Sequence, residues 1–317
     1  MIINVNPATE FYNMVNESIV SKYDIDYSGA LMHIYESELA YNSIIKSIQL
    51  DYMRESEVTD LGGFVVKLID GLIKLIKMLI EKIISLFKKF SARAKDVDLN
   101  NNKFMEIYGR RINRIDPRVK ISIEGYEMDA QRHVITGNAI AMSGTNAYLH
   151  AKDKILGQHL FSVVRYFKNK EDLNSKLSEF RHALLEEPSK SSSVSDKEFA
   201  DSLIYKFYGK KQKQDFLLDQ ATDTIRAHGL YVNSVKTATD LVRRQGDADI
   251  RELERQKSDV KRNTISDKAA IEQLQMLMNF RNKIMQDQLL ALQTLMKYVD
   301  DINRQAKTIC IKAMQEN

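Results

Sequence analysis

Between Leu61 and Phe90, polar residues recur every three or four positions, and nearly all the other residues are large and apolar. This spacing is typical of a long helix with one hydrated face. Six lysines against Asp70 and Glu81 make the segment basic. The residues that we expect to contact a membrane or a partner helix are Phe64, Leu68, Leu72, Ile76, Leu79, Ile83, Leu86 and Phe90, with Lys74, Lys77 and Lys82 on the charged face.

Three interpretations of this helix remain open after a membrane-spanning role is set aside. Spanning is disfavoured because a charge falls every three to five residues, and each costs about 2.5–3.5 kcal/mol at the centre of a bilayer. A basic amphipathic helix lying on an anionic membrane agrees with the composition. A central helix covered by the protein's other helices, or a helix seated in a groove of a partner protein, agrees with it as well.

The residues on either side of this helix extend the prediction to the first 187 positions. Residues 29–57 have helical spacing, so we expect an N-terminal helical region over residues 1–95. Residues 91–102 are polar and turn-like, and a short helix is expected over 103–112. Val119, Ile121 and Ile123 alternate with polar residues, which predicts a small β element of two or three strands around 118–128. A helix over 148–187 completes a mixed α/β middle region, residues 96–187.

The last part of the chain, residues 196–317, has the most regular pattern. A polar linker at 188–195 ends in a capping box formed by Ser195 and Glu198, and a helix should run from there until it stops near Gly209. Two long helical segments follow, over 214–262 and from residue 266 onward. A seven-residue repeat predicts a helix–helix seam in the second segment, made of Ile271, Met278, Met285, Leu292, Val299 and Ala306.

A coiled-coil seam needs a second apolar position in each seven-residue repeat, and here Arg281 and Gln288 interrupt that second series. The interruptions favour antiparallel packing on the preceding helix over a simple continuous dimer. The chain has only three prolines and twelve glycines among 317 residues, as expected for long helices. The predicted fold class is therefore mainly α, with long amphipathic helices, a C-terminal helical bundle or coiled coil, and the small β element.

Charge and cysteine content add few constraints on function. A net charge of +4 permits an acidic partner without requiring one. Cys310 is the single cysteine, so neither an internal disulfide nor a thiolate metal cluster is expected. The single cysteine is typical of a chain made in a reducing cytosol, or of one that needs no disulfides. The first residues lack the pattern of a signal peptide, so export by that route is not expected.

The search for chemical motifs predicts a protein that is not an enzyme. None of the six histidines stands in a metal-binding or triad pattern, and no phosphate-binding loop or nucleophile elbow occurs. We therefore expect no catalytic residues, no metal and no cofactor.

Two basic clusters are candidates for non-specific DNA contact. Arg110, Arg111 and Arg114 form the first, and Lys210 and Lys211 form the second, close to three aromatic residues at 205, 207 and 208. Cations interleaved with aromatic rings can contact phosphates and stack on bases. The same residues are equally typical of solvated helix ends.

The order of these features resembles internal virion or structural proteins of large tailed bacteriophages of Gram-positive hosts. The resemblance is carried by the segments LIKLIKMLIEKIISLFKKF, NNKFMEIYGRRINRI, VKISIEGYE and SVSDKEFADSLIYKFYGKK, followed by the C-terminal helices, over about residues 35–265. It implies a non-enzymatic protein located in the virion, which binds other virion proteins or itself as a homo-oligomer. The alternatives are a membrane-active or pore-forming protein that makes transient membrane contact during genome delivery, and a capsid assembly or scaffolding factor.

Overall fold

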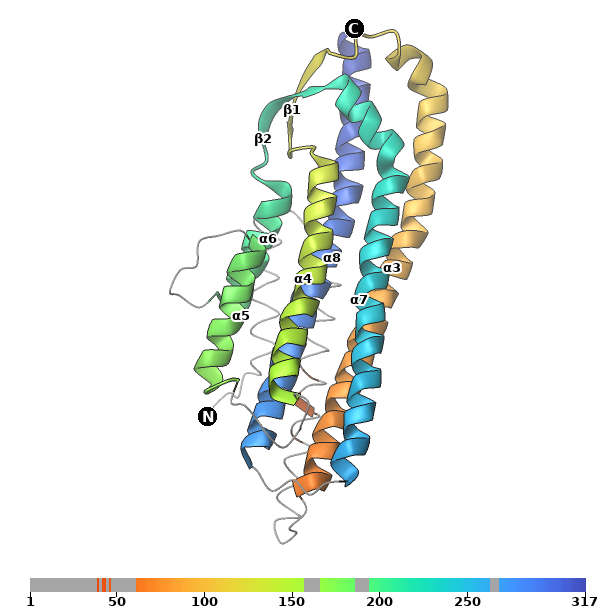
Figure 1. Cartoon of the computed structure of the whole chain (residues 1–317). Helices are drawn as coiled ribbons and strands as arrows, with labels where there is room; N and C mark the ends of the chain where they lie inside the picture. The colour runs from red at the N-terminus through yellow and green to blue at the C-terminus, as the bar shows by residue number, and fades with distance from the viewer. Residues whose placement is uncertain are drawn as a thin grey trace, which may run out of the picture. The chain divides into compact units, whose positions relative to one another are not determined.

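The structure is a computed structural model that describes residues 61–156, 166–185, 194–262 and 268–317, and the isolated positions 39, 42, 43 and 46. The described ranges contain six helices and two strands (Figure 1). They are α3 (Leu61–Ile112), β1 (Lys120–Gly125), α4 (Ala130–Leu156), α5 (Lys170–Leu185), α6 (Asp196–Tyr208), β2 (Gln212–Leu217), α7 (Leu218–Arg262) and α8 (Lys268–Glu316). The mainly α fold class is confirmed. The predictions for residues 29–57 and for most of the linker 188–195 lie outside the described residues.

Helix α3 continues 22 residues beyond Phe90, to Ile112, so the turn expected at 91–102 is wrong and the regional boundary at residue 95 falls inside a helix. The reason is tertiary. Asn101 is buried and donates a hydrogen bond to the Ile225 carbonyl at 3.1 Å. Its amide also exchanges hydrogen bonds with the Asn303 amide at 2.9 and 3.1 Å. A polar stretch therefore remains helical because its side chains are satisfied by other helices.

Helix α4 begins at Ala130, well before the helix predicted over 148–187, and it ends at Leu156 instead of continuing to 187. Gly137 lies inside it because a Cβ there would be 2.9 Å from the Leu295 side chain and 3.1 Å from Phe207. This glycine permits close packing and does not end the helix.

The small β element predicted around 118–128 is present as β1, and its partner is β2, which was expected to be part of a helix. The two strands pair antiparallel, with Ile121 opposite Phe216 and Gly125 opposite Gln212. Ile121 and Phe216 are both buried in an apolar cluster with Ala306 and Ile309 of α8. The helix predicted from residue 214 therefore starts at Leu218, after the strand.

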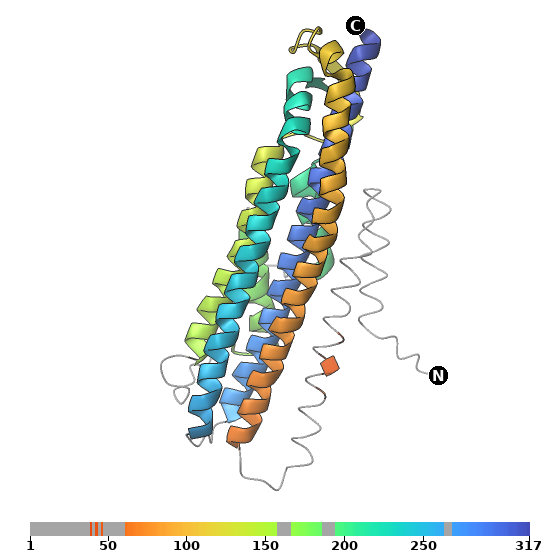
Figure 2. The same ribbon diagram turned by 90° about the vertical axis from the view of Figure 1, so that its right-hand side faces the viewer.

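The chain divides into two compact units. Unit 1 comprises residues 1–83, 141–201 and 241–290, and unit 2 comprises residues 84–140, 202–240 and 291–317. Helices α3, α4, α7 and α8 each contribute one segment to both units. In unit 1, α3 and α7 lie side by side (Figures 1 and 2), and Lys257 of α7 pairs with Asp70 of α3 at 2.5 Å.

Helix α8 supplies much of the core of each unit. Most side chains from Gln273 to Asn303 are buried, and none in this stretch is exposed. A helix covered on all sides is usually apolar throughout. Here the buried residues include Gln273, Arg281, Asn282, Gln286, Asp287, Gln288, Thr294, Asp300 and Asn303. These polar residues in the interior, and the groups that they contact, form the candidate site.

Candidate functional site

The contact face predicted for residues 61–90 is part of the protein core. Leu68, Leu72, Ile76 and Leu79 are each 1% exposed or less, and Ile83 is equally buried. Phe90 is buried in unit 2 and Leu86 is half-buried, whereas the side chain of Phe64 is not among those described. Lys74 and Lys77 are exposed and Lys82 is half-buried. Within the described ranges, no helix combines the length and apolarity needed to cross a bilayer.

The seam predicted on α8 is also internal. Met278, Met285, Leu292, Val299 and Ala306 are all buried within a single chain. The side chain of Ile271 lies outside the described set. Figure 1 shows that α8 runs antiparallel to α7, as the interruptions of the companion seam suggested. An oligomer would therefore have to form through other surfaces.

The first interruption, Arg281, is at the centre of a buried charge cluster in unit 1. Its Nη2 donates to Asp249 Oδ2 of α7 at 3.0 Å, and its guanidinium lies 4.2 Å from the centre of the Tyr148 ring of α4. Lys152 Nζ is 3.6 Å from the other oxygen of Asp249. Burial raises the pKa of Asp249, although the two cations oppose this shift. One carboxylate thus joins α4, α7 and α8.

The second interruption, Gln288, contacts backbone. Its Nε2 donates to the Ala141 carbonyl of α4 at 2.6 Å. About four helical turns earlier in α8, the amide of Gln273 makes two hydrogen bonds with the backbone of Phe167, at 3.0 and 2.7 Å. Both glutamines therefore set the position of α8 against a defined backbone segment, which an aliphatic side chain could not do.

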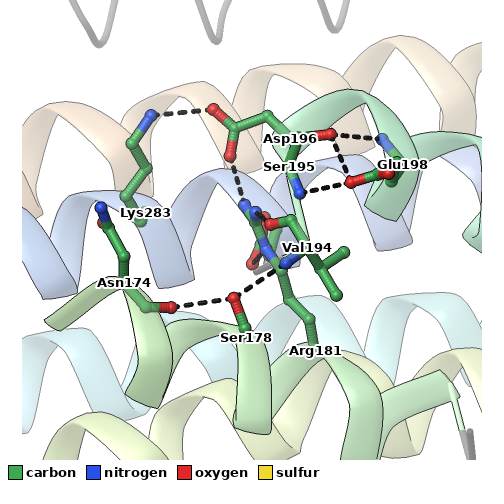
Figure 3. A network of polar contacts seen from close by, with 9 residues as sticks. Asn174, Ser178, Arg181, Val194, Ser195, Asp196, Glu198 and Lys283 are labelled. Atoms are coloured by element: carbon green, nitrogen blue, oxygen red, sulfur yellow. Dashed lines mark hydrogen bonds and ion pairs between the residues drawn. The ribbon is translucent and has the colours of Figure 1, made fainter. Parts of the chain in front are cut away.

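A larger network surrounds Arg181 of α5, also in unit 1 (Figure 3). Its guanidinium donates from Nε and Nη2 to the Asp287 carboxylate at 2.9 and 2.8 Å. Nη2 also donates to Asp196 at 2.6 Å, and Nη1 donates to the Val194 carbonyl at 3.0 Å. Lys283 of α8 donates to the second oxygen of Asp196 at 3.0 Å. Arg181 thereby connects α5, the start of α6 and α8.

The charges of this network stabilise one another. Burial opposes the charge of Arg181, but Asp287 and Asp196 outweigh it and raise the pKa of the guanidinium above its ordinary value. Burial would also raise the pKa of Asp196, but Arg181 and Lys283 lower it to about 2. Burial raises the pKa of Asp287, although the charge of Arg181 and its hydrogen bond oppose this shift. Two basic side chains thus face two acidic ones in this network.

The predicted capping box is confirmed and lies next to this network. Ser195 N donates to Glu198 Oε2 at 2.8 Å, and Glu198 N donates to Ser195 Oγ at 3.2 Å. Val194 N donates to Ser178 Oγ of α5 at 2.9 Å. The first turn of α6 is thus held both by its own cap and by contacts with α5. The helix ends before Gly209, which has a φ of 61°.

Unit 2 has a different polar contact, centred on His228 of α7. Its Nδ1 lies 2.6 Å from Asp98 Oδ1 of α3, and its Nε2 lies 3.7 Å from Asp300 Oδ1 of α8. Arg93 of α3 forms an ion pair with the other oxygen of Asp300. These four side chains therefore connect α3, α7 and α8.

The two basic clusters are exposed, but they do not form one surface. Arg110, Arg114, Lys210 and Lys211 are exposed, and Arg111 donates to the Met314 carbonyl at 2.7 Å. The arginines precede the Lys120 end of β1, whereas the lysines precede Gln212, which pairs with the Gly125 end. The two clusters thus connect to opposite ends of the sheet, which are six strand residues, roughly 17 Å, apart. Phe207 and Tyr208 are fully buried, so Tyr205 is the one exposed ring of the three expected to stack on bases.

Sequence reasoning missed Arg181, Asp196, Asp249, His228, Asp287 and Asp300. The available signal was the high density of polar residues at inward positions of α8, of which only Arg281 and Gln288 were noted. Among the described residues, no group of three His, Cys, Asp or Glu side chains could hold a metal ion. The chain matches no protein-family model and has no significant match to a curated protein or a solved structure.

Proposed function

We propose that this protein is a non-enzymatic structural component of a bacteriophage virion, in which its helices hold a single fixed arrangement. The observation that supports the proposal best is the set of buried polar contacts made by α8. They reach α5 through Arg181, α7 through Asp249, α4 through the Ala141 carbonyl and α3 through Asn101. Each long neighbour of α8 is thus held by at least one directional contact.

Such contacts favour a structural role because of their cost and their geometry. A buried ion pair contributes little net stability compared with an apolar pair of similar size, but losing one partner is strongly destabilising. An aliphatic core would tolerate a shift of one helix along another, whereas a guanidinium bound at two oxygens would not. The buried polar contacts of α8 therefore fix the register between α8 and its neighbouring helices but add little net stability. A single fixed register is useful to a protein that must fit repeatedly into an assembly.

The virion location depends on the resemblance of the segments between about residues 35 and 265 to phage structural proteins. The partners would be other virion proteins or further copies of the chain. Since the α8 seam is internal, these partners would contact the outer surfaces of the units. Non-specific DNA contact by Arg110, Arg114, Lys210 and Lys211 would occur at two separate places.

Mass spectrometry of purified virions and of assembly intermediates tests the proposal. We expect peptides of the chain in mature particles, at a constant ratio to the major capsid protein and resistant to washing at high salt. Presence in intermediates with loss on maturation would show an assembly or scaffolding factor instead. Absence from both would overturn the proposal.

A further inference from the structure

The outward face of α3 in unit 2 carries exposed side chains that are arranged symmetrically about Lys103, which is itself exposed. Leu99 precedes Lys103 by four residues and Ile107 follows it by four, and the two side chains are 60% and 67% exposed. Asp96 precedes it by seven residues and Arg110 follows it by seven, and both are exposed. At 3.6 residues per turn, all five residues lie within about 40° of the centre of one helix face.

This face of α3 is not used by the core of unit 2. On the opposite side of the helix, Asn101 is buried and donates to the Ile225 carbonyl and to Asn303. Single exposed apolar side chains are common on soluble proteins. Leu99 and Ile107 instead form a pair, about 12 Å apart along one face of a single helix. The outward face is therefore available to a partner outside the chain.

A second copy of the chain complements the order of charged and apolar residues on this face. A two-fold axis makes an interface self-complementary. If two α3 helices pack antiparallel with the axis at Lys103, Leu99 lies opposite the partner's Ile107. Asp96 then lies opposite the partner's Arg110. The symmetry repeats each pair, which gives two apolar contacts and two pairs of opposite charge.

The residue on the axis needs its own counter-charge, because Lys103 would lie next to the partner's Lys103. Glu106 is exposed and follows Lys103 by three residues, so it lies on the same side of the helix. The lysine side chain is long and flexible, and each ammonium can reach the partner's Glu106. Asp96 and Glu106 also balance the charges of Lys103 and Arg110. The face therefore has no net charge that would repel a second copy.

We propose that the outward face of α3, formed by Asp96, Leu99, Lys103, Ile107 and Arg110, is a homodimer interface in which two copies of the chain pack antiparallel about Lys103. A face of about four helical turns is smaller than the roughly 20–30 residues a side of most stable complexes. The dimer is therefore weak and forms at high protein concentration. The inference rests on the part of the proposed function in which further copies of the chain are partners.

Sedimentation analysis of the purified full chain tests the interface, over a concentration range from about 1 to about 300 µM that suits a weak complex. The average mass should rise toward that of a dimer. Arg110→Glu should raise the dissociation constant about tenfold or more, because carboxylates then face each other twice. Adding Asp96→Arg to this variant should restore dimerisation. Lys77→Glu is the matched control, because Lys77 is an exposed cation of α3 outside the face, and it should have no effect.

Oxidative crosslinking tests the position of the axis. Only a residue on a two-fold axis lies next to its own copy, so Lys103→Cys should form a disulfide-linked dimer. Lys77→Cys should remain monomeric, and the native Cys310 is buried. All the substituted positions are exposed, so the variants should fold.

Three results would overturn the inference: a wild type that stays monomeric over the whole range, a dimer that Arg110→Glu does not weaken, or equal crosslinking of the two cysteine variants. These measurements use the purified chain alone. Absence of the protein from virions, which would overturn the proposed function, would leave their outcome unchanged.

Discussion

Unit 1 and unit 2 both place charged groups against the interior of α8, but they use different chemical groups. In unit 1, Asp287 is neutralised by the guanidinium of Arg181, which keeps its charge at any pH at which the protein is folded. In unit 2, Asp300 pairs with Arg93 of α3 and lies 3.7 Å from the His228 ring of α7. Two stretches of one helix can thus have similar burial and different partners, since the side chain of Arg181 is 2% exposed and that of Arg93 is 57% exposed.

Among the substitutions that test this comparison, replacement of Arg181 should change the free energy of unfolding most. Arg181→Met would leave Asp287 buried without its partner and should lower the free energy of unfolding by about 3–5 kcal/mol in urea titrations. A second substitution, Asp287→Leu, should restore part of the loss, because no charge then remains unpaired. Arg255→Met is the control, since that guanidinium is exposed and pairs with Glu252 three residues earlier on the same helix; it should cost less than about 1 kcal/mol. Equal losses in both single variants would refute the role given to Arg181.

Acid titration should reveal the contribution of Asp196 to unit 1. Its folded pKa is about 2, below the ordinary value of 3.8, so its pairing stabilises the folded state above about pH 4 and is lost as the pH falls toward 2. Asp196→Asn should therefore cost about 2 kcal/mol at pH 7 and progressively less below pH 4.

The matched control for that titration is Asp223→Asn, because Asp223 is exposed and its contact with Arg226 is 3.8 Å long. The control should unfold like the wild type at every pH. A difference between wild type and Asp196→Asn that stayed constant down to pH 2 would contradict the assigned pKa.

Two glycines of α7 extend the comparison to the packing of α7 on α3. At Gly246 in unit 1, a Cβ would be 2.4 Å from Ile80 Cδ1, whereas at Gly229 in unit 2 the nearest atom is 3.7 Å away. Gly246→Ala should cost about 1–3 kcal/mol through overpacking. Gly229→Ala should be neutral or stabilise by up to about 1 kcal/mol through helix propensity. The midpoint of thermal unfolding is measured by calorimetry for both variants. If both substitutions shift it in the same direction, the packing of α7 on α3 does not differ between the two units at these glycines.

Vesicle binding should show the smallest effect and tests the membrane alternative for α3. Because Leu68, Leu72 and Ile76 are buried in unit 1, the intact protein should bind anionic vesicles only weakly in flotation assays. A peptide of residues 59–92 has the same side chains uncovered, so it should bind and become helical. Replacing Lys74, Lys77 and Lys82 by Glu should weaken peptide binding, most strongly at low salt. Strong binding by the intact chain would favour the membrane-active alternative.

Several elements were predictable because their signals are local. The alternation around Ile121 predicted β1, and the Ser195–Glu198 spacing predicted the start of α6. The interrupted seam of α8 correctly favoured antiparallel packing on α7. In each case the residues that produce the structure lie within a few positions of one another, or on one face of one helix.

Other elements depended on partners far away in the chain. The strand β2 is mostly polar and has little strand character of its own, but it pairs along its whole length with β1, about ninety residues earlier. The helical state of residues 91–102 is supported by the hydrogen bonds of Asn101 to Ile225 and Asn303. Such contacts cannot be read from local spacing.

The sequence by itself determined the helical class, the long apolar faces and the position of the first strand, because hydrophobic periodicity and capping act over a few residues. Only the tertiary structure decided that the apolar face of α3 is covered and that α8 is central. It also decided that Arg181, Arg281 and His228, all buried, each meet a carboxylate from another helix. The physical reason is that a charged residue on a helix has the same local pattern whether it faces water or a buried partner, and only the fold supplies that partner.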